Sequence, residues 1–360
     1  MKKTILILLP MLFAGFLVKA QVGLASVSLQ EGKINKAKEA IDKALQNEKD
    51  AQKSKTWFTK GEVYSAIAGS PLEMFHNLDK QASKTALDAY KKAMELEPQK
   101  KGYYKDAENA IKNKLFNSAI NQGINLYKKQ DYKNSMSALD VAIEVNPNDT
   151  TGFYIGSIAS LADKDYDKFI RYTEKLVDMK IDNTTYRDFT YQLAKIYSGE
   201  KKEHTKAIAL LEKAIQKQPK EVLFWQTLAD LYEQLDDKDK SVEFFKKAMV
   251  QFPTEVWYPR AIGYAYYNKA VAVNKEVTKK KEAEGLTGAL KDPKKQQKAK
   301  EYNDMVDAEL KKALPYLEKA DQLKPNEFET MDILRVIYES LGMKDKKAEM
   351  DKKIKAIGKE

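Results

Sequence analysis

Five prolines close five similar helical segments, and their spacing constrains the fold more than any other feature of the chain. Each proline ends a phrase of the form A-x3-Y-x2-A-x4-P, in which Ser can replace the first Ala and Leu or Phe the Tyr. The phrases are Ala86/Tyr90/Ala93/Pro98, Ser135/Leu139/Ala142/Pro147, Ala207/Leu211/Ala214/Pro219, Ser241/Phe245/Ala248/Pro253 and Ala313/Leu317/Ala320/Pro325. Pro219 and Pro253 are 34 residues apart, whereas the other steps are 49, 72 and 72 residues. A period of this size predicts a stack of small helical units rather than a globular enzyme domain.

The clearest copy of the unit, residues 221–253, contains two predicted helices. Its apolar and small residues recur at helical spacing: Trp225, Leu228, Ala229 and Tyr232 on the first helix, and Ser241, Phe245 and Ala248 on the second. Asp236 and Asp237 interrupt the pattern and are typical of a turn. Pro253 ends the second helix because proline cannot continue it.

This pattern, W-x2-L-A-x2-Y followed by S-x3-F-x2-A-x4-P, resembles the tetratricopeptide repeat. The resemblance covers nearly the whole chain after the first 20 residues. It implies an all-α solenoid of about eight helix-turn-helix repeats that form a right-handed superhelix. The expected units are residues 21–53, 54–99, 100–149, 150–183, 184–219, 220–253 and 254–325, followed by a C-terminal capping unit, 326–360.

Two of these units carry additional chain. About 13 extra residues surround positions 69–71, whose Gly-Ser-Pro sequence is typical of a loop. A larger insertion around 268–305 makes the unit 254–325 longer than the repeat requires by 38 residues. Its flanks are rich in Lys, Glu, Ala and Gln, and glycines and a proline at 285–293 predict a turn. We therefore expect one long lysine-rich helical hairpin.

The first 20 residues have the layout of a cleaved secretory signal peptide. Lys2 and Lys3 precede an apolar run from Ile5 to Val18, and a small residue precedes Gln21. The run is too short to span a membrane, and a retained anchor is the alternative. The bacterial style of the segment favours export across the inner membrane to the periplasm. The chain contains no cysteine, so neither a lipoprotein anchor nor a disulfide can form.

Removal of this segment would leave 60 Lys and Arg against 53 Asp and Glu, a net charge of +7. Residues 275–300 hold nine lysines and four acidic residues, so most of the excess lies in the predicted hairpin. A solvated helix with i,i+4 ion pairs explains such a run, and peripheral contact with an anionic envelope surface is the alternative. Basic residues are not spread along a predicted groove, so no nucleic acid partner is expected.

Catalytic and metal-binding motifs are absent from the sequence. The two histidines, His76 and His204, lie in predicted loops and outside any H-E-x-x-H motif. Neither a G-x-S-x-G elbow nor a glycine-rich phosphate loop occurs. The carboxylates lie on mixed Lys/Glu faces that are typical of surfaces. We therefore expect no enzyme activity, no cofactor and no metal; a hydrolase of envelope polymers is the remote alternative.

In the tetratricopeptide family the first helices of successive units line a concave groove, so the resemblance implies a set of partner-binding residues. The lining positions fall one and five residues after the Trp-type position, or one turn further. They are Phe58, Ile120, Ile124, Tyr127, Tyr154, Tyr191, Lys195, Arg260, Tyr264 and Tyr267. Aromatic residues with arginine are typical of protein interfaces. The alternative is that some of these tyrosines pack between neighbouring repeats.

Function is therefore expected from the surface of the protein. The first hypothesis is a non-catalytic periplasmic scaffold that binds an extended peptide or a partner protein in the groove. The second is a structural subunit of a cell-envelope assembly or transport complex, which docks through its outer faces and the basic hairpin. A stoichiometric partner would favour the second hypothesis, and a range of clients the first.

Overall fold

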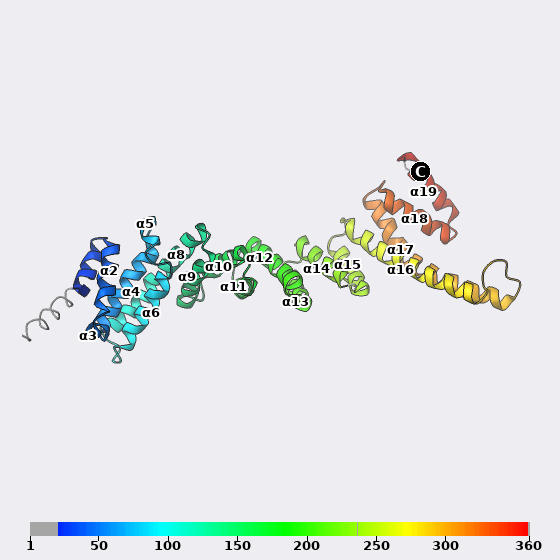
Figure 1. Ribbon diagram of the computed structural model, residues 1–360. Helices are drawn as coiled ribbons and strands as arrows, with labels where there is room; N and C mark the ends of the chain where they lie inside the picture. The colour runs from blue at the N-terminus through cyan, green and yellow to red at the C-terminus, as the bar shows by residue number, and fades with distance from the viewer. Residues whose placement is uncertain (1–20, 236, 359–360) are drawn as a thin grey trace, which may run out of the picture. The chain divides into compact units, whose positions relative to one another are not determined.

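The computed structural model describes residues 21–235 and 237–358, and the regular elements of this part are helices (Figure 1). Successive helices pack as pairs, so the predicted all-α solenoid is confirmed. The chain divides into an N-terminal unit, which ends at Lys202, and a C-terminal unit, which begins at Glu203. The predicted signal peptide lies outside the described residues. Within the described ranges, no helix is both long and apolar enough to cross a membrane.

The first element of the described part of the N-terminal unit is a helix at residues 21–30. The elements that follow are α2 (Ile34–Ala44), α3 (Glu48–Ala51), α4 (Ser54–Gly69), α5 (Glu73–His76), α6 (Ala82–Glu95), α7 (Tyr103–Ala110), the π-helical η1 (Ile111–Leu115), α8 (Phe116–Lys128), α9 (Tyr132–Val145), α10 (Thr150–Asp163), α11 (Tyr166–Asp178), α12 (Asn183–Lys195) and the π-helical η2 (Ile196–Glu200). In the expected unit 100–149, α7 and η1 run directly into α8, so residues 103–128 are continuously helical.

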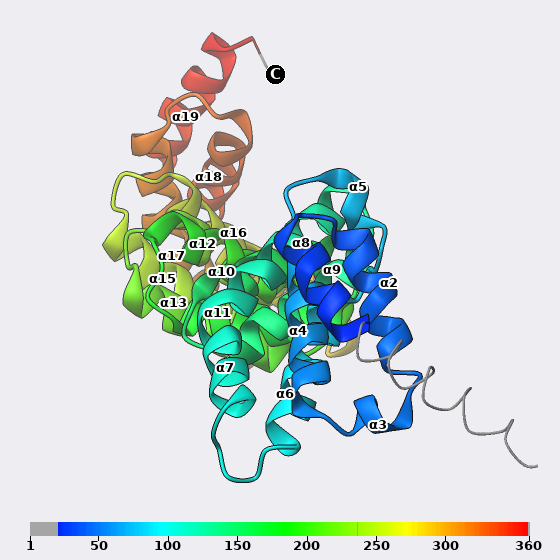
Figure 2. The same cartoon turned by 90° about the vertical axis from the view of Figure 1, so that its left-hand side faces the viewer.

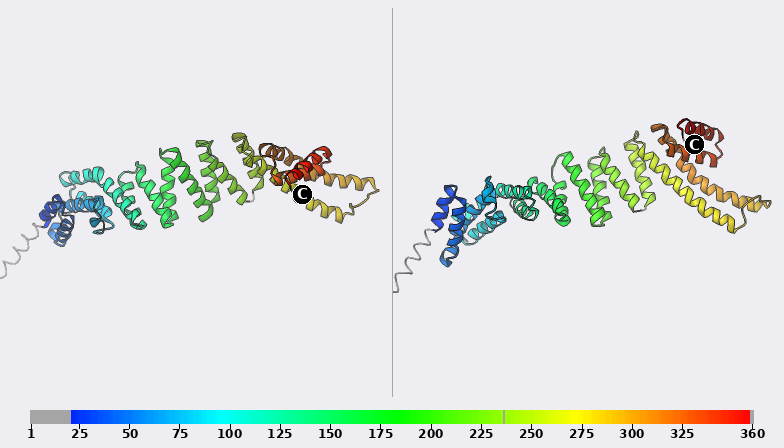
Figure 3. Two further views of the ribbon diagram at one scale, coloured as in Figure 1. Left: turned by 90° about the horizontal axis from the view of Figure 1, so that it is seen from above. Right: turned by 45° about the horizontal axis from the view of Figure 1, so that its top comes forward.

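The C-terminal unit consists of α13 (His204–Lys217), α14 (Val222–Gln234), α15 (Lys238–Gln251), α16 (Trp257–Ala283), α17 (Pro293–Leu323), α18 (Phe328–Ser340) and α19 (Lys344–Ala356). The helices α16 and α17 lie side by side along their length and are joined by a loop at the far end of the pair (Figure 3). This pair is the lysine-rich hairpin that the sequence predicts. Asp237, predicted to lie in a turn, caps α15 by accepting a hydrogen bond from the Lys240 backbone N–H.

Glycines allow the two helices of a pair to approach closely. A Cβ atom on Gly61 of α4 would lie 2.5 Å from the ring of Tyr90 in α6. A Cβ atom on Gly263 of α16 would lie 2.5 Å from Cγ of Leu317 in α17. Tyr90 and Leu317 are both fully buried. The contact of α4 with α6 in Figure 2 therefore depends on a side chain being absent at the crossing point.

Tyrosine hydroxyls connect one helix pair to the next. Tyr64 of α4 donates a hydrogen bond to the carboxylate of Asp42 in α2, at 2.8 Å. Tyr338 of α18 donates to Glu318 of α17, at 3.0 Å. Burial raises the pKa of both tyrosines, and the carboxylates raise it further. Because each hydroxyl remains protonated, it can donate this bond throughout the neutral pH range.

Candidate partner-binding pocket

A pocket of about 590 Å³ opens on the C-terminal unit among α14, α15, α16 and α18. One face of α16 supplies most of its lining, because six residues recur at helical spacing: Trp257, Arg260, Ala261, Tyr264, Ala265 and Asn268. The small side chains of the two alanines leave the central part of this face open. The volume lies in the range of ligand-binding pockets in proteins.

Two predicted groove residues, Arg260 and Tyr264, lie together in this pocket. The Arg260 guanidinium forms an ion pair with Glu327 at 2.6 Å. The Tyr264 hydroxyl lies 3.5 Å from Oγ1 of Thr330, and Thr330 donates to Glu327 at 3.2 Å. Both side chains are thus held against α18 and the residue before it. This fixes the position of the guanidinium and the phenol before any ligand binds.

Aromatic rings form a rigid wall of the pocket. Phe245 of α15 is 1% exposed, and its ring meets that of Trp257 edge-on, with centroids 5.1 Å apart. Trp257 is half-buried and also contacts Tyr258 edge-on, at 5.2 Å. Rings held in this way offer apolar contact area at a small entropic cost, which suits them to anchor a partner.

Charged groups of both signs surround the aromatic wall. Glu233 of α14 and Glu329 of α18 contribute carboxylates, and Lys238 and Arg260 contribute cations. Burial raises the pKa of Glu233 above its ordinary value, and the nearby Asp230 raises it further. Within the described residues, no three His, Asp or Glu side chains gather to hold a metal ion. The arrangement is therefore suited to binding a chain of mixed polarity.

The groove residues predicted in the first units contribute mainly to packing. The Phe58 ring lies 6.0 Å from that of Tyr90 and 5.4 Å from that of Tyr103, so α7 covers it. Ile120 is buried, and Ile124 packs against the same hydrophobic core. These three side chains therefore pack against neighbouring helices.

The later groove residues of the N-terminal unit are more accessible. Tyr154 is 41% exposed and meets Phe189 of α12 edge-on, at 5.4 Å. Tyr127 is half-buried and packs against the core of the neighbouring pair. Lys195 is exposed, and its Nζ lies 5.3 Å from the centre of the Tyr191 ring. None of these side chains lines the pocket on α16.

Tyr267, the last predicted residue, is half-buried against the core of the C-terminal pairs and does not line the pocket. The sequence interpretation missed Trp257, Asn268 and Glu329. Trp257 and Asn268 could have been found, because they continue the helical stripe of the predicted Arg260. Glu329 lies in α18, so the helical spacing of residues along α16 could not predict that it lines the pocket.

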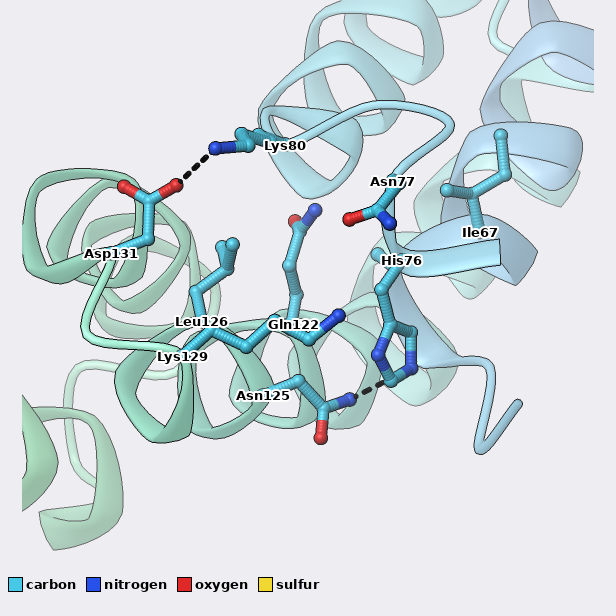
Figure 4. A pocket seen from close by; sticks show the side chains of 10 residues that line it. Ile67, His76, Asn77, Lys80, Gln122, Asn125, Leu126, Lys129 and Asp131 are labelled. Atoms are coloured by element: carbon cyan, nitrogen blue, oxygen red, sulfur yellow. Dashed lines mark hydrogen bonds and ion pairs between the residues drawn. The ribbon is translucent and has the colours of Figure 1, made fainter. Parts of the chain in front are cut away.

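A second pocket, of about 100 Å³, lies in the N-terminal unit between α5 and α8 (Figure 4). His76 of α5 points towards α8, where its Nε2 lies 3.1 Å from the Asn125 side-chain nitrogen. The Lys80 ammonium pairs with Asp131 at 2.7 Å across the other end of the pocket. These contacts attach the insertion between α4 and α6 to the following helix pair. The pocket is small and closed by its own polar contacts, so we assign it a role in packing.

Two segments of the chain, residues 18–51 and 223–249, match the tetratricopeptide repeat family model. The resemblance found in the sequence is thus confirmed for these segments. No curated protein matches the chain. Solved structures with similar folds include PilF of Pseudomonas aeruginosa, at 11% identity over 67% of this chain and 91% of that chain, with a TM-score of 0.33. Another is YrrB, a TPR protein with an unusual peptide-binding site, at 16% identity over 68% of this chain and 97% of that chain, with a TM-score of 0.34. MamA is similar at 21% identity over 53% of this chain and 91% of that chain, with a TM-score of 0.31.

Proposed function

We propose that this protein is a non-catalytic scaffold that binds an extended peptide, or an extended segment of a partner protein, through the pocket on α16. The observation that carries the proposal is the continuous stripe of Trp257, Arg260, Tyr264 and Asn268 beside two alanines. Aromatic residues and arginine in a concave site concentrate binding energy.

A peptide fits the chemistry of this pocket better than a small anion or cation does. Carboxylates and cations are interspersed along its walls, so neither sign of charge predominates. The exposed amide of Asn268 can both donate and accept hydrogen bonds, as a peptide main chain requires. The rings of Trp257 and Tyr264 supply apolar contact for side chains.

We further propose that the protein acts in the periplasm after export. Support comes from the charged start, the short apolar run and the small residue before Gln21. Mass spectrometry of the protein produced in a bacterial host should find Gln21 as the first residue. An intact Met1 in membrane fractions would contradict the assignment.

The pocket can be tested by filling it. Linear peptides are first selected from a displayed library on residues 21–360, and their affinity is measured by calorimetry. Ala265→Trp places an indole in the pocket and should weaken binding by about tenfold or more. Ala272→Trp is the matched control, because Ala272 is exposed on the same helix and outside the pocket lining.

Circular dichroism must show equal helicity for the two variants. Asn268→Ala provides a gentler second change at an exposed position, and it should also weaken binding. Equal affinity of the wild type, Ala265→Trp and Asn268→Ala for the selected peptides would exclude this pocket as the binding site.

A further inference from the structure

The far end of the α16/α17 hairpin carries positive charge that internal ion pairs do not neutralise. Of the nine lysines in 275–300, Lys280 pairs with Glu276 at 2.6 Å and Lys298 with Glu284 at 2.8 Å. Lys281 donates a hydrogen bond to Asn303. The remaining six are exposed and have no carboxylate of the described residues within ion-pair distance: Lys275, Lys279, Lys291, Lys294, Lys295 and Lys300.

Helix stability explains only some of these lysines. Lys280 and Lys281 lie in the last turn of α16, where a cation stabilises the helix dipole. Lys294 and Lys295 lie in the first turn of α17, where a cation opposes the dipole and where no acidic residue is present. Asp292 uses its side chain to cap the backbone N–H of Lys294, at 2.9 Å. The lysines at the start of α17 therefore weaken the helix locally, which points to a role outside the hairpin.

The lysines also lie close together where α17 begins. Lys294 and Lys298 are four residues apart on one face of α17, Lys295 adjoins Lys294, and Lys291 directly precedes the N-cap residue Asp292. The loop end of the hairpin lies away from α18 and α19 in both views of Figure 3. Within the C-terminal unit, this end of the hairpin is thus open to a large flat partner.

The residue types define the class of that partner. Residues 275–300 contain no arginine and no aromatic residue. Arginine would favour bidentate recognition of single phosphates, and aromatic rings would stack on nucleic acid bases. Lysines are compact point charges that fit a diffuse anionic field such as a lipid surface. Of the two leucines in the turn, Leu286 is 5% exposed and Leu290 is partly buried, so neither is fully exposed for insertion into a bilayer.

We propose that the hairpin end, residues 275–300, binds peripherally to a bilayer that contains anionic lipids. The attraction is electrostatic and is carried by the six lysines without an ion pair: Lys275 and Lys279 of α16, Lys291 in the loop, and Lys294, Lys295 and Lys300 of α17. The contributions of several lysines near an anionic leaflet add, so together they hold a protein at the surface without an inserted segment.

The test is co-sedimentation of residues 21–360 with vesicles of phosphatidylcholine, with and without phosphatidylglycerol, at low and high salt. The wild type should bind only the vesicles with phosphatidylglycerol, and salt should release it. The triple variant Lys291→Glu, Lys294→Glu, Lys295→Glu should lower the partition coefficient by about tenfold or more. Glutamate favours the start of a helix, so this variant should keep the hairpin folded.

A matched control makes the same change in net charge elsewhere. Lys101→Glu, Lys105→Glu, Lys112→Glu alters three exposed lysines in the unit 100–149 and should leave vesicle binding nearly unchanged. Equal loss in both triple variants would show a net-charge effect and would overturn the proposal. So would binding that is insensitive to salt or to phosphatidylglycerol. If the hairpin lysines bind a DNA duplex but not vesicles, the surface is a nucleic acid site and the proposal is wrong.

Discussion

At the scale of single residues, a tryptophan joins the first helix of a unit to the chain that precedes it by a hydrogen bond. The indole N–H of Trp57 donates to the Ala51 carbonyl at 2.7 Å, and that of Trp225 donates to the Pro219 carbonyl at 2.9 Å. Each bond spans six residues and ties the start of a first helix to the preceding chain. The same residue type thus performs the same task in two units that are far apart in sequence.

Tyr258 is a buried tyrosine that lacks such a bond. It is 1% exposed, and its hydroxyl has no hydrogen-bond partner among the described residues. Burial raises the pKa of Tyr258 to about 12, and Glu255 adds to the effect. An unsatisfied buried hydroxyl costs stability, so Tyr258→Phe should stabilise the protein by about 1 kcal/mol in urea unfolding. Tyr338→Phe, which removes a bond to Glu318, should destabilise it. Destabilisation by Tyr258→Phe would show that the hydroxyl has a partner.

At the scale of elements, one carboxylate joins three helices of the C-terminal unit. Glu327 directly precedes α18 and pairs with Arg260 of α16 at 2.6 Å and with Lys324, which follows α17, at 3.0 Å. A carboxylate at the start of a helix also stabilises the helix dipole. Because Arg260 lines the pocket, this ion pair connects the packing of α18 to the shape of the proposed binding site.

This ion pair predicts a pH dependence of stability. The hydrogen bond from Arg260, helped by Lys324, lowers the pKa of Glu327 from 4.5 to about 2. The folded state therefore binds the proton less tightly than the unfolded state, so the stabilisation is complete above pH 4.5 and is lost as pH falls towards 2. Glu327→Gln should flatten the pH dependence of the urea midpoint in this window. Glu329→Gln, which removes a carboxylate without an ion pair in the described structure, should leave it unchanged.

At the scale of the whole molecule, the buried residues form several clusters rather than one core. One cluster covers residues 22–142 in the N-terminal unit, and another contains Trp225, Phe245 and Tyr258 in the C-terminal unit. Each cluster joins elements that are close in sequence. Stability in such a chain is approximately a sum of local terms and nearest-neighbour interfaces.

Removal of one large buried side chain should therefore destabilise its own helix pair most and more distant pairs less. Trp225 is 7% exposed, so Trp225→Ala should cost about 3–5 kcal/mol, the range for a large buried aromatic residue. Hydrogen exchange should show the loss of protection in α14, α15 and the start of α16, while α4 to α9 keep theirs. An equal loss of hydrogen-exchange protection in both units would contradict a nearest-neighbour description of stability. Val250→Ala, at a residue that is 80% exposed, is the control.

The sequence by itself determined the helix pairs and the long hairpin. Proline, glycine and the spacing of apolar residues determine the backbone within one or two helical turns. The helices they define can therefore be predicted without knowledge of the tertiary contacts. The turn at Asp237 and the hairpin ends were predicted for this reason. The expected unit 150–183 likewise forms the regular pair α10 and α11, in which Gly156 lies against the ring of Tyr172.

Only the tertiary structure decided which groove positions are open. The same spacing rule selects Phe58 and Arg260, but α7 covers Phe58, whereas Arg260 lines a pocket. The sequence showed that residues 275–300 are rich in lysine. Which of these lysines lack an ion pair depends on how α16 and α17 pack against each other. Exposure depends on elements that are distant in sequence, such as Glu327, which lies 67 residues from Arg260. Spacing along a single helix carries no information about such neighbours, so the pocket emerged only when the helices were packed together.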